Sequence, residues 1–172
     1  DYNADAIQWL PDGKSLYMIA CKEAVTHIWQ VGVADKQIRQ ITSGQYDYVS
    51  MHSVGNTMAA IRQSQVNPSE VFAVNTQTGE AAEISFENKA ILDQLTMPKS
   101  ESRWIKTTDN KQMLTWVVYP PHFDPAKKYP AILYCQGGPQ STVSQFWSYR
   151  WNLAIMASQG YIVVAPNRRG LP

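Results

Sequence analysis

Short apolar segments, each bounded by turn residues, recur through the first half of the chain. Residues 16–21 and 28–33 form one pair of such segments, and residues 58–61 and 71–74 form another. Gly, Pro, Asp and Asn separate them, and many of their side chains are β-branched or aromatic, which is the pattern of β-strands joined by turns. Alternation of apolar and polar positions is present but imperfect, as in strands covered on both faces. This half is therefore predicted to be antiparallel β-structure.

The two pairs of segments are related by a constant offset of 43 residues. It separates Trp29 from Phe72, Ile28 from Val71, Val31 from Val74, and Ile41 from Ile84. A repeat of roughly 40–45 residues with about four strands per unit is typical of β-propeller blades. Two hairpins of a β-sandwich are the alternative, but an offset kept without a gap favours the propeller. Residues 1–90 are predicted to hold two blades, and since closed propellers use about 4–8 blades, others are expected before Asp1.

A different pattern begins after the repeat. Residues 87–95 are predicted to form a short linking helix. Residues 103–107 and 111–119 flank a turn at Asp109 and Asn110, which predicts a β-hairpin.

Two buried strands and a helix are predicted next. Residues 131–136 and 161–165 are apolar runs rich in branched and aromatic side chains, which favours buried strands. Between them, residues 145–159 place apolar side chains on one face of a helix, with Ser144 as the N-cap and Gly160 after its end. A hairpin, a strand, a helix and a strand in this order are typical of the start of an α/β sheet with right-handed crossovers.

The strand predicted at residues 131–136 is followed at once by Gly137, Gly138 and Pro139. Glycines at the end of a buried strand leave backbone N–H groups able to face a ligand. In α/β-hydrolases the loop after the third strand supplies one donor of the oxyanion hole. Gln136, Gly137 and Gly138 are therefore candidate catalytic residues. The structural alternative is a tight turn with close backbone packing for the glycines, and an ordinary loop side chain for Gln136.

Composition narrows the function further. The 172 residues carry a net charge of +1 and scattered basic side chains, so nothing points to nucleic-acid binding. The longest apolar runs are too short to span a bilayer. Cys21 and Cys135 are too few for a disulfide framework or a zinc site, and no metal or cofactor is expected. Both lie in apolar, strand-like runs, so we expect buried free thiols. His27, His52 and His122 are expected to be surface or packing residues.

An ordered set of motifs along the chain resembles the prolyl oligopeptidase family of serine peptidases. The motifs are residues 9–14 (WLPDGK), 28–29 (IW), 40–42 (QIT), 123–125 (FDP), 127–130 (KKYP), 137–139 (GGP) and 165–170 (APNRRG). The resemblance implies a mixed fold. Residues 1–90 would be a partial β-propeller of two antiparallel blades, and residues 91–172 the N-terminal part of an α/β-hydrolase domain. It also implies cleavage of short peptides by acyl transfer, of the dipeptidyl-peptidase or acylaminoacyl-peptidase type.

Members of this family carry a Ser-Asp-His triad on the hydrolase domain. No Gly-x-Ser-x-Gly occurs in this sequence, so the triad is expected outside it and the 172 residues alone are expected to be inactive. Peptide is the expected substrate of the full-length enzyme, and open blade edges are expected to favour self-association. Periplasmic and cytoplasmic locations both stay open. A non-catalytic propeller module for protein binding and a carboxylesterase are the alternative functions.

The resemblance also assigns roles to single residues. The family places Tyr or His just before the glycine pair, where this chain has Gln136. Its amide is one candidate oxyanion donor, and a backbone N–H of Gly137 or Gly138 is the other. Arg168 and Arg169 lie where the family keeps an Arg before a Gly. They are expected either to form an ion pair between segments or to bind the substrate near its carbonyl groups.

Overall fold

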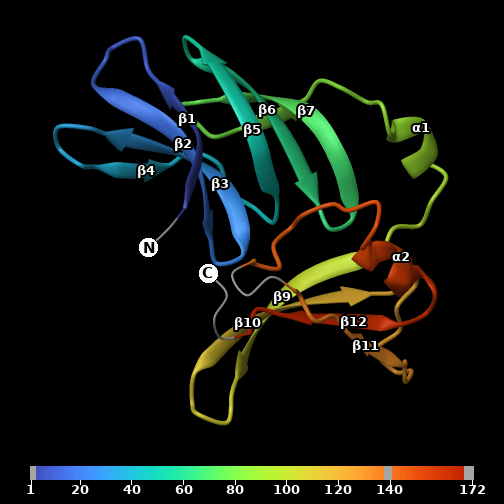
Figure 1. Cartoon of the computed structure of the whole chain (residues 1–172). Coiled ribbons are helices and arrows are strands. Elements are labelled where there is room, and N and C mark those ends of the chain that lie inside the picture. The colour runs from blue at the N-terminus through green and yellow to red at the C-terminus, as the bar shows by residue number, and fades with distance from the viewer. Residues whose placement is uncertain (1–2, 138–140, 169–172) are drawn as a thin grey trace. The chain divides into compact units, whose positions relative to one another are not determined.

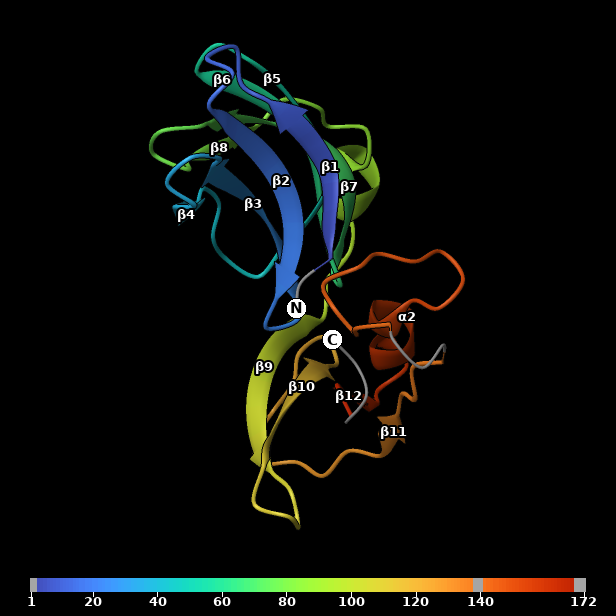
Figure 2. The ribbon, with the colours of Figure 1, turned by 60° about the vertical axis from the view of Figure 1, so that its left-hand side comes forward.

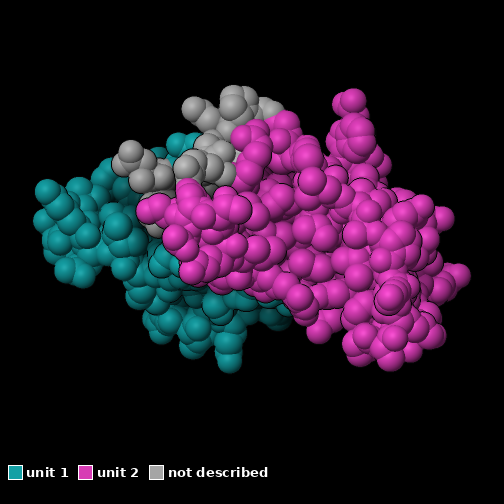
Figure 3. Space-filling model, turned by 90° about the horizontal axis from the view of Figure 1, so that it is seen from below, with its two compact units in different colours: residues 1–64, 69–87 teal, residues 65–68, 88–172 magenta. Residues whose placement is uncertain are grey.

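The chain divides into two compact units in a computed structural model that describes residues 3–137 and 141–168. Unit 1 comprises Asp1–Ser64 and Ser69–Glu87, and unit 2 comprises Gln65–Pro68 and Asn88–Pro172 (Figure 3). The division after residue 87 lies close to the predicted boundary at residue 90. The assignment of Gln65–Pro68 to unit 2 has no counterpart in the sequence analysis.

Unit 1 consists of two successive four-stranded meanders (Figure 1). The strands of the first are β1 (Ala4–Trp9), β2 (Ser15–Lys22), β3 (Val25–Gly32) and β4 (Ile38–Gln40). Those of the second are β5 (Asp47–Val54), β6 (Thr57–Ser64), β7 (Asn67–Asn75) and β8 (Ala81–Glu83). A single parallel pair, Thr26 with Asp47, joins β3 to β5. The Asp47 carboxylate also accepts the Thr26 backbone N–H, at 2.9 Å.

The 43-residue repeat is confirmed by the strand bounds and by the pairing register. Trp29 of β3 pairs with Gln40 of β4, and Phe72 of β7 pairs with Glu83 of β8. Both partners of the second pair lie 43 residues after those of the first. Trp29 and Phe72 therefore occupy equivalent strand positions.

The core of unit 1 draws on both meanders. Its buried members are Tyr17, Ile19, Ile28, Ile41, Tyr48, Met58, Ala60, Phe72 and Val74. Equivalent positions are not equally buried, because Phe72 belongs to this core whereas Trp29 is only half-buried. The Arg62 guanidinium lies 3.6 Å from the centre of the Phe72 ring and 3.9 Å from that of Tyr46, so its charge is held between two aromatic faces.

Unit 2 contains a four-stranded sheet in the order β11-β12-β10-β9. Its strands are β9 (Lys99–Lys106), β10 (Gln112–Tyr119), β11 (Ala131–Leu133) and β12 (Ile162–Pro166). The predicted hairpin is confirmed, and β9 begins before residue 103, so that β9 and β10 form a long antiparallel ribbon (Figure 2). The pair β11–β12 is parallel and the other pairs are antiparallel.

Apolar side chains from paired strands form the core of this sheet. Trp116 and Val118 of β10 pair with Ala165 and Val163 of β12, and none of the four is more than 1% exposed. Residues two apart on a strand share a face, so these four side chains cover one face together. The helix α2 (Leu153–Ser158) packs against β10 and β12.

Both predicted helices are much shorter than expected. The helix predicted over residues 145–159 is wrong in extent, because only Leu153–Ser158 is helical. The Ser148 hydroxyl accepts the backbone N–H groups of Arg150 and Trp151, which favours a turn over a helix. Asn152, not Ser144, is the N-cap, and its side chain accepts the Ile155 N–H at 2.9 Å.

Within the predicted linking segment, residues 87–95, only α1 (Lys89–Leu92) is α-helical. The backbone N–H groups of Gln94 and Leu95 bond to carbonyls three residues earlier. The α-helix is therefore followed by tighter turns of the 3₁₀ type. In the described part of the chain, neither helix approaches the length or apolar character that a bilayer crossing demands.

Gln65 explains why a short loop groups with unit 2. Its side chain is 2% exposed, and its Nε2 donates to the Ser144 carbonyl at 2.8 Å. Its Oε1 accepts the Ser100 hydroxyl at 2.6 Å. The backbone N–H of Gln65 donates to the Gln145 side chain at 3.3 Å. A buried carboxamide with both ends bonded ties this loop to segments distant in the sequence.

Candidate functional site

The candidate turn lies where two parallel strands end. Val164 of β12 pairs with Leu133 of β11, and the Val164 carbonyl accepts the backbone N–H of Tyr134 at 2.8 Å. The chain then leaves the sheet through Cys135, Gln136 and Gly137. Asn167 directly follows β12. Because β11 and β12 are parallel, Asn167 lies at the same end of the sheet as the turn. Ligand sites of open α/β sheets lie outside the carboxyl ends of the strands.

The Gln136 side chain is held by a neighbouring tyrosine. Its Oε1 accepts the Tyr134 hydroxyl at 2.8 Å, and Gln136 is half-buried. Burial raises the pKa of the Tyr134 hydroxyl above its ordinary value. The hydroxyl is protonated at neutral pH and donates in this bond, because a carboxamide oxygen can only accept.

Gly137 has open space on its side-chain face. A Cβ placed there would meet none of the described atoms within 4 Å, and the φ of Gly137 is not in the left-handed region. Close packing and a special dihedral angle therefore do not explain this glycine. The open face leaves room for another molecule to approach the backbone. Gly138, the other predicted glycine, lies outside the described residues.

The segment that follows the turn is clamped at Val143. The Asn167 side chain accepts the Val143 N–H at 2.8 Å and donates to the Val143 carbonyl at 3.0 Å. The Trp116 indole N–H donates to the same carbonyl at 2.9 Å. The Asn167 backbone N–H is itself bonded to the Leu114 carbonyl at 2.8 Å. The loop is thereby fixed to the ends of β10 and β12.

The other residues singled out from the sequence have different environments. Arg168 is exposed and follows β12, at the same end of the sheet as the turn. Arg169 lies outside the described residues. The expectation for the histidines is confirmed. His27 is buried, with its Nδ1 3.1 Å from the Thr42 hydroxyl and its pKa lowered by burial, while His52 and His122 are exposed.

The prediction of buried thiols is wrong for both cysteines. Cys135 is exposed and Cys21 is only half-buried. The reason for Cys135 is the length of its strand. Within the described residues β11 ends at Leu133 and lies at the edge of the sheet, so the chain beyond it has no cover. Leu133 itself is 64% exposed.

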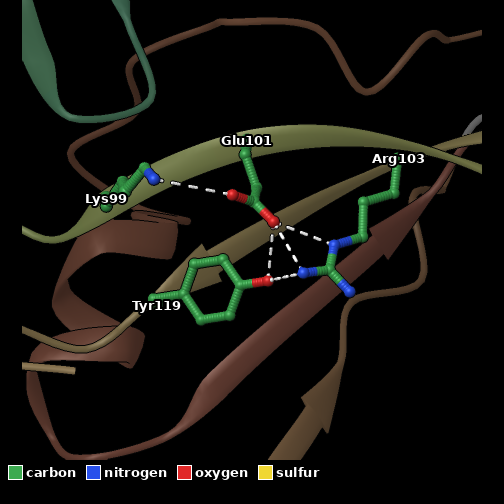
Figure 4. A network of polar contacts seen from close by, with 4 residues as sticks. All are labelled: Lys99, Glu101, Arg103 and Tyr119. Carbon is green, nitrogen blue, oxygen red and sulfur yellow. Dashed lines mark hydrogen bonds and ion pairs between the residues drawn. The ribbon is translucent and has the colours of Figure 1, made fainter. Parts of the chain in front are cut away.

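A polar network lies on the paired strands β9 and β10 of the same sheet (Figure 4). One carboxylate oxygen of Glu101 accepts the Tyr119 hydroxyl at 2.8 Å and the Arg103 Nε–H at 2.9 Å. Arg103 Nη2 also donates to the Tyr119 hydroxyl. The Lys99 Nζ lies 3.7 Å from the second Glu101 oxygen. The Tyr119 hydrogen bond, followed by that of Arg103, lowers the pKa of Glu101.

This network is separate from the candidate turn. Tyr119 ends β10 and pairs with Lys99, whereas Asn167 contacts Leu114 near the beginning of β10. Tyr119 and the Asn167 contact therefore lie at opposite ends of β10. Across the described parts of the chain, His, Cys, Asp and Glu side chains form no group of three that could hold a metal ion.

Two contacts at the turn were missed by sequence reasoning. Tyr134 and Gln136 are two residues apart, the spacing of side chains on one side of an extended segment, and this signal could have revealed their contact. Asn167 was quoted only as part of a motif. An Asn just after a buried strand is suited to binding backbone groups, but nothing nearby in the sequence indicates Val143 as its partner.

Comparison with known proteins shows that this chain is similar to part of the dipeptidyl-peptidase 5 proteins of two Porphyromonas species. It is 58% identical over all 172 residues to dipeptidyl-peptidase 5 of Porphyromonas gingivalis, and it spans 25% of that protein. It is 52% identical over 158 residues to dipeptidyl-peptidase 5 of Porphyromonas endodontalis, covering 92% of this chain and 23% of that protein. This chain belongs to the prolyl oligopeptidase family. No protein-family model matches it.

Solved structures share the fold of this prolyl oligopeptidase family chain. The acylaminoacyl peptidase of Pyrococcus horikoshii aligns with a TM-score of 0.80 at 20% identity, covering 99% of this chain and 26% of that one. The AtxE2 isopeptidase aligns with a TM-score of 0.73 at 12% identity, covering 95% of this chain and 25% of that one. The chain thus spans about a quarter of the proteins that it matches.

Proposed function

We propose that this chain is one segment of a longer serine peptidase that cleaves short peptides by acyl transfer, of the dipeptidyl-peptidase or acylaminoacyl-peptidase type. The observation that carries the proposal is the 58% identity to a dipeptidyl-peptidase 5, which extends over every residue of the chain. At that identity over 172 residues, a common fold and a common role within the larger protein are the simplest explanation.

Unit 1 is proposed to be two blades of a β-propeller. Support comes from comparing equivalent positions in its two meanders. Phe72 is buried in the core that the meanders share, whereas its equivalent Trp29 lines an apolar groove of about 290 Å³ with Met18, Ala20 and Ile38. A further meander, stacked in the same way, would cover this groove. Stacked four-stranded units of this length are the architecture of a propeller.

Unit 2 is proposed to be the beginning of an α/β-hydrolase domain, with the turn at Gln136 and Gly137 in its oxyanion hole. Support comes from the parallel pair β11–β12, the intervening helix α2 and the open face of Gly137. In acyl transfer a serine oxygen bonds to the scissile carbonyl carbon while a histidine accepts the serine proton. The π electron pair of the carbonyl group moves onto the carbonyl oxygen, which becomes negatively charged. Donors at the turn would stabilise that negative charge.

The test uses the full-length protein that contains this chain, assayed with chromogenic dipeptidyl and acyl-aminoacyl substrates. We expect turnover with at least one class and inactivation by a serine-directed phosphonate. The 172 residues alone should be inactive, since they contain no Gly-x-Ser-x-Gly. A folded full-length protein that turns over neither class, yet captures a protein partner through its β-rich part, would favour the binding-module alternative.

A further inference from the structure

We propose that Tyr134 is a positioning residue that orients the Gln136 carboxamide so that its Nε2 serves as an oxyanion donor. The observation is the hydrogen bond from the Tyr134 hydroxyl to Gln136 Oε1, at 2.8 Å. The proposal rests on the peptidase function proposed above, because an oxyanion forms only during acyl transfer. It gives Gln136 a direct catalytic role and assigns Tyr134 a role that the sequence did not suggest.

The orientation of a carboxamide decides whether Gln136 helps or opposes the reaction. A glutamine side chain carries an acceptor oxygen and a donor nitrogen on the same planar group. If the oxygen faced the developing negative charge, its lone pairs would repel that charge. With Oε1 engaged by the Tyr134 hydroxyl, the Nε2 group is the end that remains for a ligand. An ordered donor needs no reorganisation when the charge develops.

Tyr134 is itself well placed for this task. Its backbone N–H is bonded to the Val164 carbonyl, so the residue is anchored to the sheet just before the chain turns away. Its ring is half-buried, and a tyrosine hydroxyl is protonated at neutral pH. A protonated hydroxyl can donate to Oε1, whereas a tyrosinate would attract Nε2 instead and reverse the carboxamide. The open face of the adjacent Gly137 leaves room for a substrate carbonyl beside this group.

The geometric part is tested by a spectroscopic readout of the full-length protein that contains this chain, and this readout needs no activity. In the ¹⁵N spectrum of selectively labelled glutamine, the Gln136 side-chain amide is assigned with Gln136→Asn. We expect Tyr134→Phe to shift this signal and to speed exchange between its two protons, because the bond that restrains the carboxamide is gone. Tyr149→Phe is the matched control, since Tyr149 is 82% exposed and contacts Trp147 rather than Gln136. An unchanged Gln136 signal in Tyr134→Phe overturns the proposal.

The catalytic part is tested in the full-length protein. We expect Gln136→Ala to lower kcat by about a hundredfold or more with little change in KM. Tyr134→Phe should lower kcat by about tenfold, because a misplaced donor loses part of its effect. In the Gln136→Ala background, Tyr134→Phe should have no further effect on kcat, since Tyr134 acts through Gln136.

The outcomes separate this proposal from the proposed function. If the full-length protein is no peptidase, the proposed function and the donor role of Gln136 both fail, while the spectroscopic result still decides whether Tyr134 orients Gln136. If it is a peptidase and Tyr134→Phe leaves kcat unchanged, or lowers kcat equally with and without Gln136, the positioning role is wrong. Loss of helical and sheet signals in Tyr134→Phe would be recognised by circular dichroism. Tyr134→Met, which also lacks the hydroxyl, then takes its place with the same expected results.

Discussion

Single side chains determine the path of the chain after the parallel strands. Asn167 satisfies both backbone groups of Val143, and Val143 is fully buried. A buried backbone group that loses its partner costs far more than an exposed one, because water cannot replace the lost bond. The amide of Asn167 therefore contributes to stability through the loop that it binds.

We expect Asn167→Ala to lower the free energy of unfolding by about 1–3 kcal/mol, the usual cost of an unsatisfied buried polar group. Chemical denaturation followed by tryptophan fluorescence measures this change. Gln159→Ala is the control, because Gln159 is exposed and should alter stability very little. Equal stability of the Asn167 and Gln159 variants would contradict the clamp.

Glu101 provides a prediction about pH. The Tyr119 hydroxyl and the Arg103 guanidinium lower its pKa in the folded chain. A carboxyl whose folded pKa is lowered stabilises the fold above its unfolded pKa, and this contribution is lost as pH falls through the folded value. Tyr119→Phe should therefore raise the pKa of Glu101 toward its ordinary value, as measured by the ¹³C titration of its carboxyl group.

The accompanying loss of stability should be small, about 1 kcal/mol or less, because the network is largely exposed to solvent. It should be seen at neutral pH and vanish in acid, once Glu101 is protonated in both variants. Tyr149→Phe supplies the comparison, with an unchanged Glu101 titration. A Glu101 pKa that stays low in Tyr119→Phe would show that the Tyr119 hydrogen bond is not its main cause.

Among the strands, equivalent positions of the repeat have different surroundings. Phe72 is 6% exposed and stacks on Arg62, whereas Trp29 is half-buried and bonds through its indole N–H to the Ala20 carbonyl at 3.1 Å. The repeat therefore predicts which residues correspond, but the stacking of the meanders decides which of them is covered. Large-to-small changes have their greatest cost where the cavity that they leave is enclosed.

Phe72→Ala should consequently destabilise this chain by about 3–5 kcal/mol, and Trp29→Ala by clearly less. Thermal unfolding followed by circular dichroism compares the two. Phe72→Leu, which retains most of the apolar volume, is the milder variant if Phe72→Ala does not fold. The prediction fails if the two alanine variants are equally stable.

At the scale of the whole chain, the sheet of unit 1 has uncovered edges and apolar side chains. β1 and β8 are the two ends of its strand order, and Ile7 and Trp9 on β1 are 60% and 56% exposed. Unpaired edge strands recruit other strands, and natural edges are often protected by charged side chains. An apolar edge of this kind favours association with another strand.

The isolated chain is therefore expected to self-associate as its concentration rises, and static light scattering measures the increase in mean mass. Ile7→Lys should reduce this association, because a lysine on an edge strand opposes edge-to-edge pairing. Lys14→Arg serves as the control, since it keeps the charge of a residue in the adjacent turn. A constant monomer mass up to the highest soluble concentration would refute the prediction.

Several features of this protein are determined by the sequence itself. The 43-residue repeat and the β9–β10 hairpin depend on residues close together along the chain, where turn chemistry and strand propensity act directly. The motif residues 123–130 and the Gly137 turn led to the family for the same reason. Such local patterns can be recognised in the sequence because few long-range contacts compete with them.

Other features were decided by the tertiary structure. The helix predicted over residues 145–159 is limited to α2, because Ser148 and Asn152 bind backbone groups and Val143 is held by Asn167, which lies 24 residues away. Gln65 joins unit 2 through Ser144, 79 residues away. Side chains bond to whatever donors and acceptors folding brings near them, and an uncharged hydrogen-bonding side chain leaves no periodic signal in the sequence.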